Sequence, residues 1–156
     1  MELRIRLSTP PDAPTLARIA RAARASWGYP AEWLDLWSPK LTLTPEYFDR
    51  HLVFLATVDG ETAGCCALED HSTHWMLEQV WIAPEAQRAG VGKALVRHAL
   101  RRAADSRPGI VRVHADPNAT DFFLGLGAEL IGAVAAPMPG APDRRLPVLE
   151  FEVAPR

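Results

Sequence analysis

Cysteine is scarce in this chain of 156 residues, and its placement is as informative as its number. The two cysteines, Cys65 and Cys66, are adjacent. Neighbouring residues of a strand point to opposite faces of a sheet, so we expect no disulfide between them. Their spacing also supplies no set of zinc ligands. We therefore predict a protein without a metal that keeps its thiols reduced in the cytoplasm.

Long apolar runs and an excess of basic charge are missing as well. No segment approaches the ~18 apolar residues of a membrane span, and the opening MELRIRL lacks the hydrophobic core of a signal peptide. A net charge of −2 argues against nucleic acid as a partner. We expect a small-molecule substrate instead, with monomer and homodimer both open. A solvated helix face is the expected place of four clustered arginines, Arg97, Arg101, Arg102 and Arg107.

The patterning that is present predicts one domain spanning 1–156, with an α/β fold. Alternating apolar residues predict strands at 2–7, 51–58, 61–69, 74–82, 110–115, 128–134 and 146–153. Helical spacing of apolar residues predicts helices at 13–25, 31–37, 44–52, 91–105 and 116–128. This order indicates a mixed, mostly antiparallel central sheet of about seven strands, flanked by helices and containing one central crossover.

A glycine-rich turn, EAQRAGVGKAL at residues 85–95, separates a predicted strand from a predicted helix. Lys93 is followed by Ala94 where a Walker loop requires serine or threonine, and Leu95 stands where a dinucleotide fingerprint requires its third glycine. Neither nucleotide motif is therefore present. Glycines at the start of a helix still allow a diphosphate to approach its free amide groups, although such a turn can also be empty.

Two segments resemble elements of the GCN5-related N-acetyltransferase (GNAT) superfamily. QRAGVGKA, from Gln87, is similar to the glycine-containing element that follows the fourth strand of that family. DPNATDFFLGLGA, from Asp116, resembles its second element, and the order of elements agrees over essentially the whole chain. The resemblance implies a GNAT-like fold and acetyl-CoA as the co-substrate. The residues that it assigns to the coenzyme are Val80, Trp81, Ile82, Gln87, Arg88, Ala89, Gly90, Val91, Gly92, Lys93, Ala94, Asn118 and Phe123.

The same resemblance implies direct transfer of an acetyl group to an amine, with Glu78 as the general base. Strand alternation places Glu78 on the same side as Val80 and Ile82, and apolar neighbours are expected to raise the pKa of its carboxyl group. Phe123 stands where many relatives carry the tyrosine that protonates the departing thiolate. Water, Tyr29 or Tyr47 remains available for that step.

The segment SWGYPAEWLDLW covers the acceptor site in similar enzymes, and we predict that Trp27 and Tyr29 line it. Trp33 and Trp37 are one helical turn apart and are expected to pack on the core. The predicted function is acetyl transfer from acetyl-CoA to a primary amine of a small molecule. The alternative is a domain that binds or senses acyl-CoA without efficient catalysis. Asn118 is assigned to the coenzyme, although capping of the following helix by Asn118 or Asp116 is an equal alternative.

Overall fold

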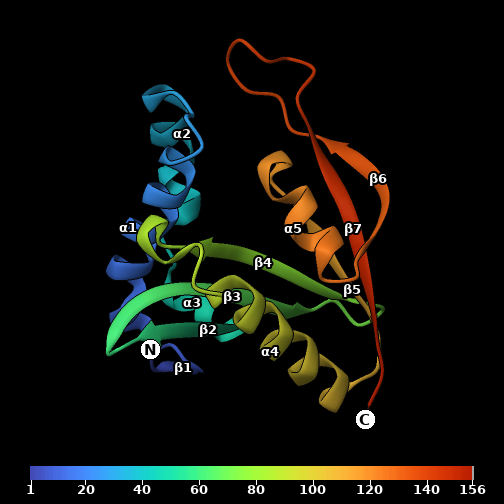
Figure 1. The fold of residues 1–156 in the computed structure, drawn as a ribbon. Helices are drawn as coiled ribbons and strands as arrows, with labels where there is room; N and C mark the ends of the chain where they lie inside the picture. The colour runs from blue at the N-terminus through green and yellow to red at the C-terminus, as the bar shows by residue number, and fades with distance from the viewer. Residues whose placement is uncertain (156) are drawn as a thin grey trace.

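The computed structural model describes residues 1–155, and seven strands form one mixed sheet (Figure 1). The sheet has the strand order β1-β2-β3-β4-β5-β7-β6. The strands are β1 (Leu3–Leu7), β2 (His51–Val58), β3 (Glu61–Asp70), β4 (Trp75–Ile82), β5 (Gly109–His114), β6 (Glu129–Ala135) and β7 (Arg145–Val153). The predicted fold class is confirmed.

Five α-helices among the described residues flank this sheet. They are α1 (Ala13–Ala25), α2 (Ala31–Leu41), α3 (Pro45–Arg50), α4 (Val91–Ser106) and α5 (Thr120–Gly125). Helix α2 runs past its predicted end because Leu41 is buried one turn after Trp37. The helix predicted at 116–128 is shorter, since a 3₁₀ turn precedes α5. None of the described helices combines the length and apolarity needed to cross a membrane.

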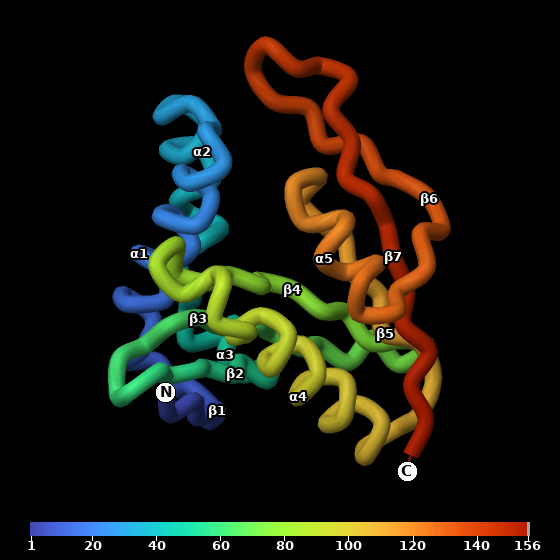
Figure 2. The backbone as a smooth tube through the Cα atoms, viewed as in Figure 1, coloured from blue at the N-terminus to red at the C-terminus, as the bar shows by residue number. Residues whose placement is uncertain are grey.

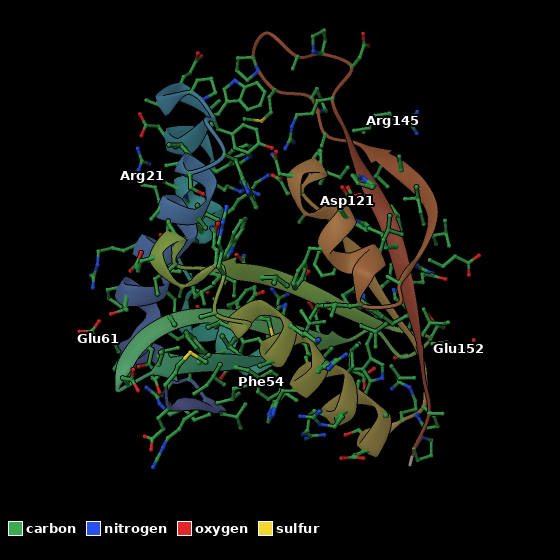
Figure 3. The ribbon with its side chains drawn as sticks, in the orientation of Figure 1. Arg21, Phe54, Glu61, Asp121, Arg145 and Glu152 are labelled. Carbon is green, nitrogen blue, oxygen red and sulfur yellow. The ribbon has the colours of Figure 1, made fainter. Side chains whose placement is uncertain are left out.

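Adjacent cysteines on β3 reveal what covers each face of the sheet. The Cys66 thiol lies 3.6 Å from the backbone oxygen of Leu95 in α4, whereas Cys65 points to the other face. Phe54 of β2 lies on the α4 face, with its ring centroid 4.8 Å from that of His98 (Figure 3). Both thiols are buried and free, and burial raises the pKa of Cys65 to about 12.

The only parallel contact recorded in the described sheet joins β4 to β5, and it is short. Trp75, Met76 and Leu77 pair with residues 111–113, after which the two strands separate. Strands β1–β4 and β5–β7 consequently form two halves that turn away from each other, as Figure 2 shows. Parallel pairing requires a crossover connection, which α4 provides. The separation opens the sheet at its centre.

A β-bulge interrupts β4 beside this opening. Glu78 pairs with Ala67, but Trp81 pairs with Cys65, so β4 contains one more residue than β3 between these two pairs. Gln79 adopts a φ of 52° at the insertion. The expected alternation therefore fails: Trp81 shares the face of Glu78, and Ile82 lies on the opposite face, towards α4. The prediction that Glu78 and Ile82 point to the same side is wrong for this reason.

Candidate active site

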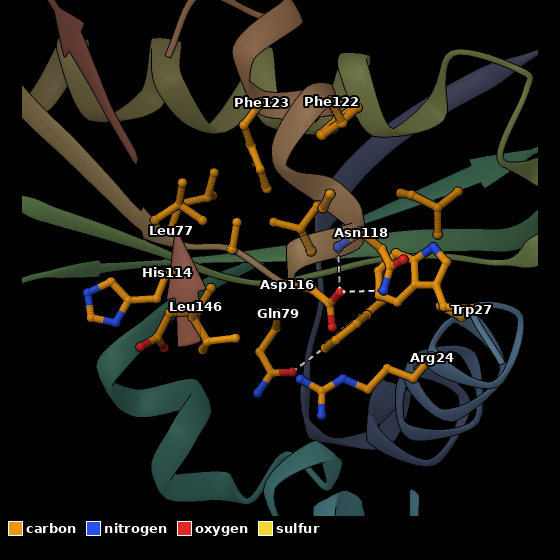
Figure 4. Close-up of a pocket in the computed structure, with 18 of the residues that line it drawn as sticks. Arg24, Trp27, Leu77, Gln79, His114, Asp116, Asn118, Phe122, Phe123 and Leu146 are labelled. Atoms are coloured by element: carbon orange, nitrogen blue, oxygen red, sulfur yellow. Dashed lines mark hydrogen bonds between the residues drawn. The ribbon is translucent and has the colours of Figure 1, made fainter. Parts of the chain in front are cut away.

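A cavity of about 940 Å³ lies where β4 and β5 separate. Its walls come from β4, the start of α4, the segment leading into α5, and helices α1 and α2 (Figure 4). The predicted residues that line it are Trp27, Glu78, Val80, Trp81, Ile82, Gln87, Gly90, Gly92, Lys93, Asn118 and Phe123. The opening in the sheet thus gathers segments that lie far apart in the sequence into one site.

The first turn of α4 presents amide groups for which no acceptor is recorded in residues 1–155. The first helical hydrogen bond runs from the Ala94 amide to the Gly90 oxygen at 3.1 Å, so the amides at 91–93 precede the hydrogen-bonded helix. No side-chain cap is recorded for this end among the described residues. The positive end of the helix dipole and the exposed Lys93 lie at the same place. This end of the cavity is suited to an anion such as a diphosphate.

The two glycines of this turn are required for different reasons. Gly90 has a φ of 77°, a left-handed conformation that glycine adopts without strain, and a Cβ there would meet no atom within 4 Å. At Gly92, a Cβ would lie 3.2 Å from the ring of Phe122 and 3.4 Å from Ile82. Gly92 therefore makes room for Phe122, a role that the sequence did not reveal; it also lines the cavity, and its contact with the coenzyme stays a prediction.

Four residues predicted to contact the coenzyme do not line the cavity: Arg88, Ala89, Val91 and Ala94. Val91 is fully buried beneath the turn, whereas Arg88 is exposed. The Gln87 side chain donates a hydrogen bond to the Ile82 oxygen at 3.3 Å and so joins the turn to the end of β4. The backbone of residues 88–91 can still contact a coenzyme, but the structure gives no support for a direct role of the Arg88 side chain.

Glu78 belongs to a cluster that the sequence did not reveal. The Tyr47 hydroxyl donates to Glu78 Oε2 at 3.0 Å, and His51 Nε2 lies 2.8 Å from the same oxygen. Glu69 Oε2 lies 2.6 Å from His51 Nε2, and the exposed His71 lies 3.5 Å from Glu69. The cluster extends from the cavity to the surface.

The acceptors around His51 determine its protonation. His51 Nδ1 lies 2.9 Å from the Tyr47 backbone oxygen, which can only accept a hydrogen bond. Its other nitrogen faces two carboxylates, so an imidazolium satisfies every contact. Although burial lowers the pKa of His51, the hydrogen bond to Glu78 contributes to a net rise above the ordinary value.

The pKa of Glu78 is lowered, which contradicts the expected rise. Burial alone would raise it, but the hydrogen bond and charge of His51, together with the Tyr47 hydroxyl, outweigh burial. Glu78 is therefore an ionised carboxylate held by two donors. Burial raises the pKa of Tyr47, so its hydroxyl group keeps its proton.

Aromatic side chains enclose the end of the cavity opposite α4. Trp27, Trp37 and Trp81 line it, and the Trp27 and Trp81 ring centroids are 6.3 Å apart. Trp37 packs on the core, as expected, and in addition lines the cavity. Tyr29 does not line the cavity, which corrects its assignment to the acceptor; it packs behind the wall, 5.1 Å from Trp37 between ring centroids.

Asp116 connects this wall to the segment before α5. Its carboxylate accepts hydrogen bonds from the Tyr29 hydroxyl at 2.9 Å and from the amide and side chain of Asn118, each at 2.9 Å. Arg144 lies 3.6 Å from it. Asp116 therefore caps the turn that leads into α5, which decides the choice between Asp116 and Asn118 that the sequence left open. Asn118 both binds Asp116 and lines the cavity.

Phe123 contributes packing to the cavity wall. It is 2% exposed and packs on Phe122 and Phe151, with ring centroids 5.0 and 6.4 Å away. Its ring lies beside that of Phe122 in the upper part of Figure 4. Without a hydroxyl it cannot donate a proton. Of the two candidate tyrosines, only Tyr47 lines the cavity.

Comparisons with known proteins give a family and a fold. The model of a family described as the acetyltransferase (GNAT) family matches residues 16–128. No curated protein matches. The fold is similar to the PaiA N-acetyltransferase of Thermoplasma acidophilum, solved in complex with coenzyme A (17% identity, 97% of this chain, 99% of that chain, TM-score 0.79).

Two further solved structures have the same fold. One is a GCN5-related N-acetyltransferase from Rhodopseudomonas palustris (20% identity, 98% of this chain and 97% of that one, TM-score 0.81). The other is the ribosomal-protein-S18-alanine N-acetyltransferase of Escherichia coli (16% identity, 99% of this chain and 96% of that one, TM-score 0.74). At these identities the likeness establishes the fold, and the residues of this chain must indicate the chemistry.

Proposed function

Because this chain belongs to the acetyltransferase (GNAT) family and is an acetyl-CoA-dependent N-acetyltransferase, we propose that it acetylates a primary amine of a small molecule by direct transfer. The observation that carries the proposal is a single cavity with two unlike ends. Free amides at the start of α4 form one end, and the carboxylate of Glu78 faces the same space. Anion binding and proton removal are thereby brought together.

The residues present fit acetyl-CoA. The free amides at 91–93 and the Lys93 ammonium group suit its pyrophosphate. Gln79 and Val80 have no register partner in β3, and pairing with β5 ends at Leu77, so the β4 backbone in the bulge can bind the amide groups of the pantetheine arm. When bound, acetyl-CoA supplies the thioester carbonyl that an amine attacks.

Glu78 accepts a proton from the attacking amine. An amine nitrogen that bonds to the acetyl carbon becomes strongly acidic at its N–H groups, so an ionised carboxylate of low pKa is a sufficient base. His51 holds Glu78 in its ionised form and orients it. Glu69 and the exposed His71 continue the cluster to the surface, which gives the proton an exit that avoids the cavity.

Tyr47 is the hydroxyl donor of this site. Its hydroxyl group is bonded to Glu78 and retains its proton, so it can donate towards a departing thiolate. The missing tyrosine at Phe123 therefore does not leave the site without a proton donor. A thiol with a pKa of ~8.5 is also a fair leaving group, which limits how much an acid must contribute.

The walls of the cavity favour a small acceptor. The Trp33 indole donates to the Pro139 oxygen at 3.0 Å and joins α2 to the loop between β6 and β7. These two segments lie beside each other above the centre of the sheet in Figure 1. Together with the tryptophans they bound the acceptor end on several sides, which suits a compact amine better than the flat surface of a protein.

Calorimetric titration with acetyl-CoA tests the coenzyme end. Lys93→Glu reverses a charge at the free amides, and Arg97→Glu makes the same change on an exposed position further along α4. We expect Lys93→Glu to weaken binding at least tenfold and Arg97→Glu to change it less than twofold. Gly90→Glu is less informative, because a φ of 77° strains any side chain.

Thiol release with a panel of amines tests the reaction. We expect turnover with small primary amines and a loss of at least 100-fold in kcat in Glu78→Gln. Binding of acetyl-CoA without release to any small amine would support the alternative of a binding or sensing domain, and release only with peptides would refute the small-molecule acceptor.

A further inference from the structure

Arg24 is a cationic side chain at the acceptor end for which the described residues provide no carboxylate or hydrogen-bond partner. It comes from α1, is half-buried and lines the cavity (Figure 4). Its guanidinium carbon lies 3.8 Å from the ring centroid of Trp37 and 4.7 Å from that of Trp81. The two indoles fix the guanidinium position and exclude water from its flanks.

Nothing in residues 1–155 neutralises this charge directly. No ion pair is recorded for Arg24 there, and its buried Nε has no hydrogen-bond acceptor. Burial lowers the pKa of Arg24 to about 10, partly opposed by the charge of Asp116. Uncompensated charge in a buried place is costly, so an arginine that lacks a partner there indicates a ligand that provides one.

The nearby carboxylates are already occupied. Asp116 accepts from Tyr29 and Asn118 and faces Arg144, while Glu78 is held by His51. Arg144 also lowers the pKa of Arg24, as a second positive charge close by does. The acceptor end therefore has an excess of positive charge, despite the net charge of −2 of the whole chain.

We propose that the acceptor carries a carboxylate group that Arg24 binds, so that the substrates are amino carboxylates. The inference rests on the proposed function, because it orients the acceptor with its amine towards Glu78. A planar guanidinium group with several N–H donors matches a carboxylate in a bidentate arrangement. Gln79, on the bulge next to Glu78, points towards Arg24 in the cavity (Figure 4), so the bulge brings the strand that carries Glu78 close to Arg24.

The test uses ω-amino carboxylates with spacers of increasing length, each compared with its own neutral carboxamide. The amine of each carboxamide is less basic than that of its carboxylate, and this difference falls as the spacer lengthens, so rates are compared per concentration of unprotonated amine and then report on the carboxylate. Thiol release is measured with wild type, Arg24→Gln, Arg24→Lys and the control Arg21→Gln. Arg21 lies on the same helix but outside the cavity, where it pairs with Asp35 at 2.8 Å (Figure 3).

We expect wild type to favour one length of carboxylate over its amide by roughly 30-fold or more in kcat/KM. Arg24→Gln should abolish that preference mainly through KM, and Arg24→Lys should restore part of it. Arg21→Gln should keep the wild-type preference. Thermal unfolding of Arg24→Gln checks that the variant folds, and removal of an uncompensated charge is not expected to destabilise it.

A second measurement does not depend on turnover. The N-acetylated ω-amino carboxylates, which are the products, are titrated by calorimetry into protein saturated with coenzyme A, beside the corresponding amides. Equal binding or equal turnover of carboxylate and amide in wild type would overturn the inference, as would a preference that survives in Arg24→Gln. Turnover only of amines that lack a carboxylate would refute the inference and leave the proposed function intact. Absence of all thiol release would refute the proposed function, and the product titration would still decide the role of Arg24.

Discussion

Replacing His51 with glutamine removes the cation that lies between two carboxylates. His51 Nε2 is 2.6 Å from Glu69 and 2.8 Å from Glu78 in the folded protein. Glutamine keeps a polar side chain in this place but carries no charge. We expect the pKa of Glu78, which is lowered in the wild-type protein, to rise above its ordinary value in the variant.

The expected size of this rise follows from the geometry. One imidazole nitrogen of His51 and one carboxylate oxygen each of Glu69 and Glu78 lie within 4.8 Å of one another. The two carboxylate oxygens are therefore no farther apart than this. Two like charges at that distance repel by about 3.5 kcal/mol at an effective dielectric constant of about 20. This repulsion corresponds to about 2.5 pKa units in full. Because Glu78 is about a third exposed, water screens part of this repulsion, and we expect the pKa of Glu78 to rise by less than the full amount but to above its ordinary value.

The assay is the pH dependence of kcat/KM for thiol release. Where Glu78 and the amine must both lose a proton, log(kcat/KM) rises with slope two, and above the pKa of Glu78 it rises with slope one. The bend should lie below pH 4.5 in wild type and above pH 4.5 in His51→Gln. His98→Gln, on α4, should behave like wild type. A bend in His51→Gln at the same pH as in wild type, or below it, would refute the coupling of His51 to the base.

Four further predictions follow from the same structure. Because the folded protein raises the pKa of His51, protonation of His51 stabilises the fold. This stabilisation is fully present below about pH 6.5 and is lost as pH rises through the higher pKa of the folded state. The difference in urea unfolding free energy between wild type and His51→Gln should therefore shrink as pH rises above 6.5. Gly64→Ala should destabilise the protein by about 1–3 kcal/mol, because a Cβ there would lie 2.7 Å from a backbone oxygen of β4, whereas Gly125→Ala has open space and should not. Tyr47→Phe should lower kcat and Tyr29→Phe should leave it nearly unchanged; equal turnover of the two would exclude a tyrosine acid. Thiol release should survive incubation with EDTA and dialysis, since a proton on His51 satisfies its two carboxylates; loss of activity that zinc restores would instead assign a metal to this cluster.

The sequence predicted the parts of the site that local patterns encode. Apolar alternation located the strand that carries Glu78, and the glycines around Val91 marked the start of the helix that follows. Both features depend on residues close together in the chain, where periodicity and turn chemistry act directly. The positions of Gly90 and Lys93 in the cavity follow from them.

The bulge in β4 could not be predicted by alternation. Gln79 inserts one residue into the ladder, and the strand pattern contains no glycine or proline that would signal it. The insertion brings Trp81 to the face of Glu78 and turns Ile82 away. A reading of the strand with a period of two must place these side chains incorrectly.

The charged partners were missed because they come from distant segments. His51 lies 27 residues before Glu78, and only the folding of β2 against β3 and β4 brings them together. The available signal was a histidine at the start of the otherwise apolar segment HLVFLATV. In the sequence, nothing distinguishes Arg24 from the other arginines of α1. Only the structure shows that its guanidinium group contacts the rings of Trp37 and Trp81.

The short pairing of β4 with β5 also bears on how two reactants can meet. The gap connects the face covered by α4 with the face of Glu78 and Trp81, so residues from both faces of the sheet line the same cavity. Both thiols of the chain are fully buried, which leaves no cysteine to carry an acetyl group between two half-reactions. The proposed direct transfer requires both reactants in one ternary complex, and a cavity lined from both faces of the sheet offers room for the two together.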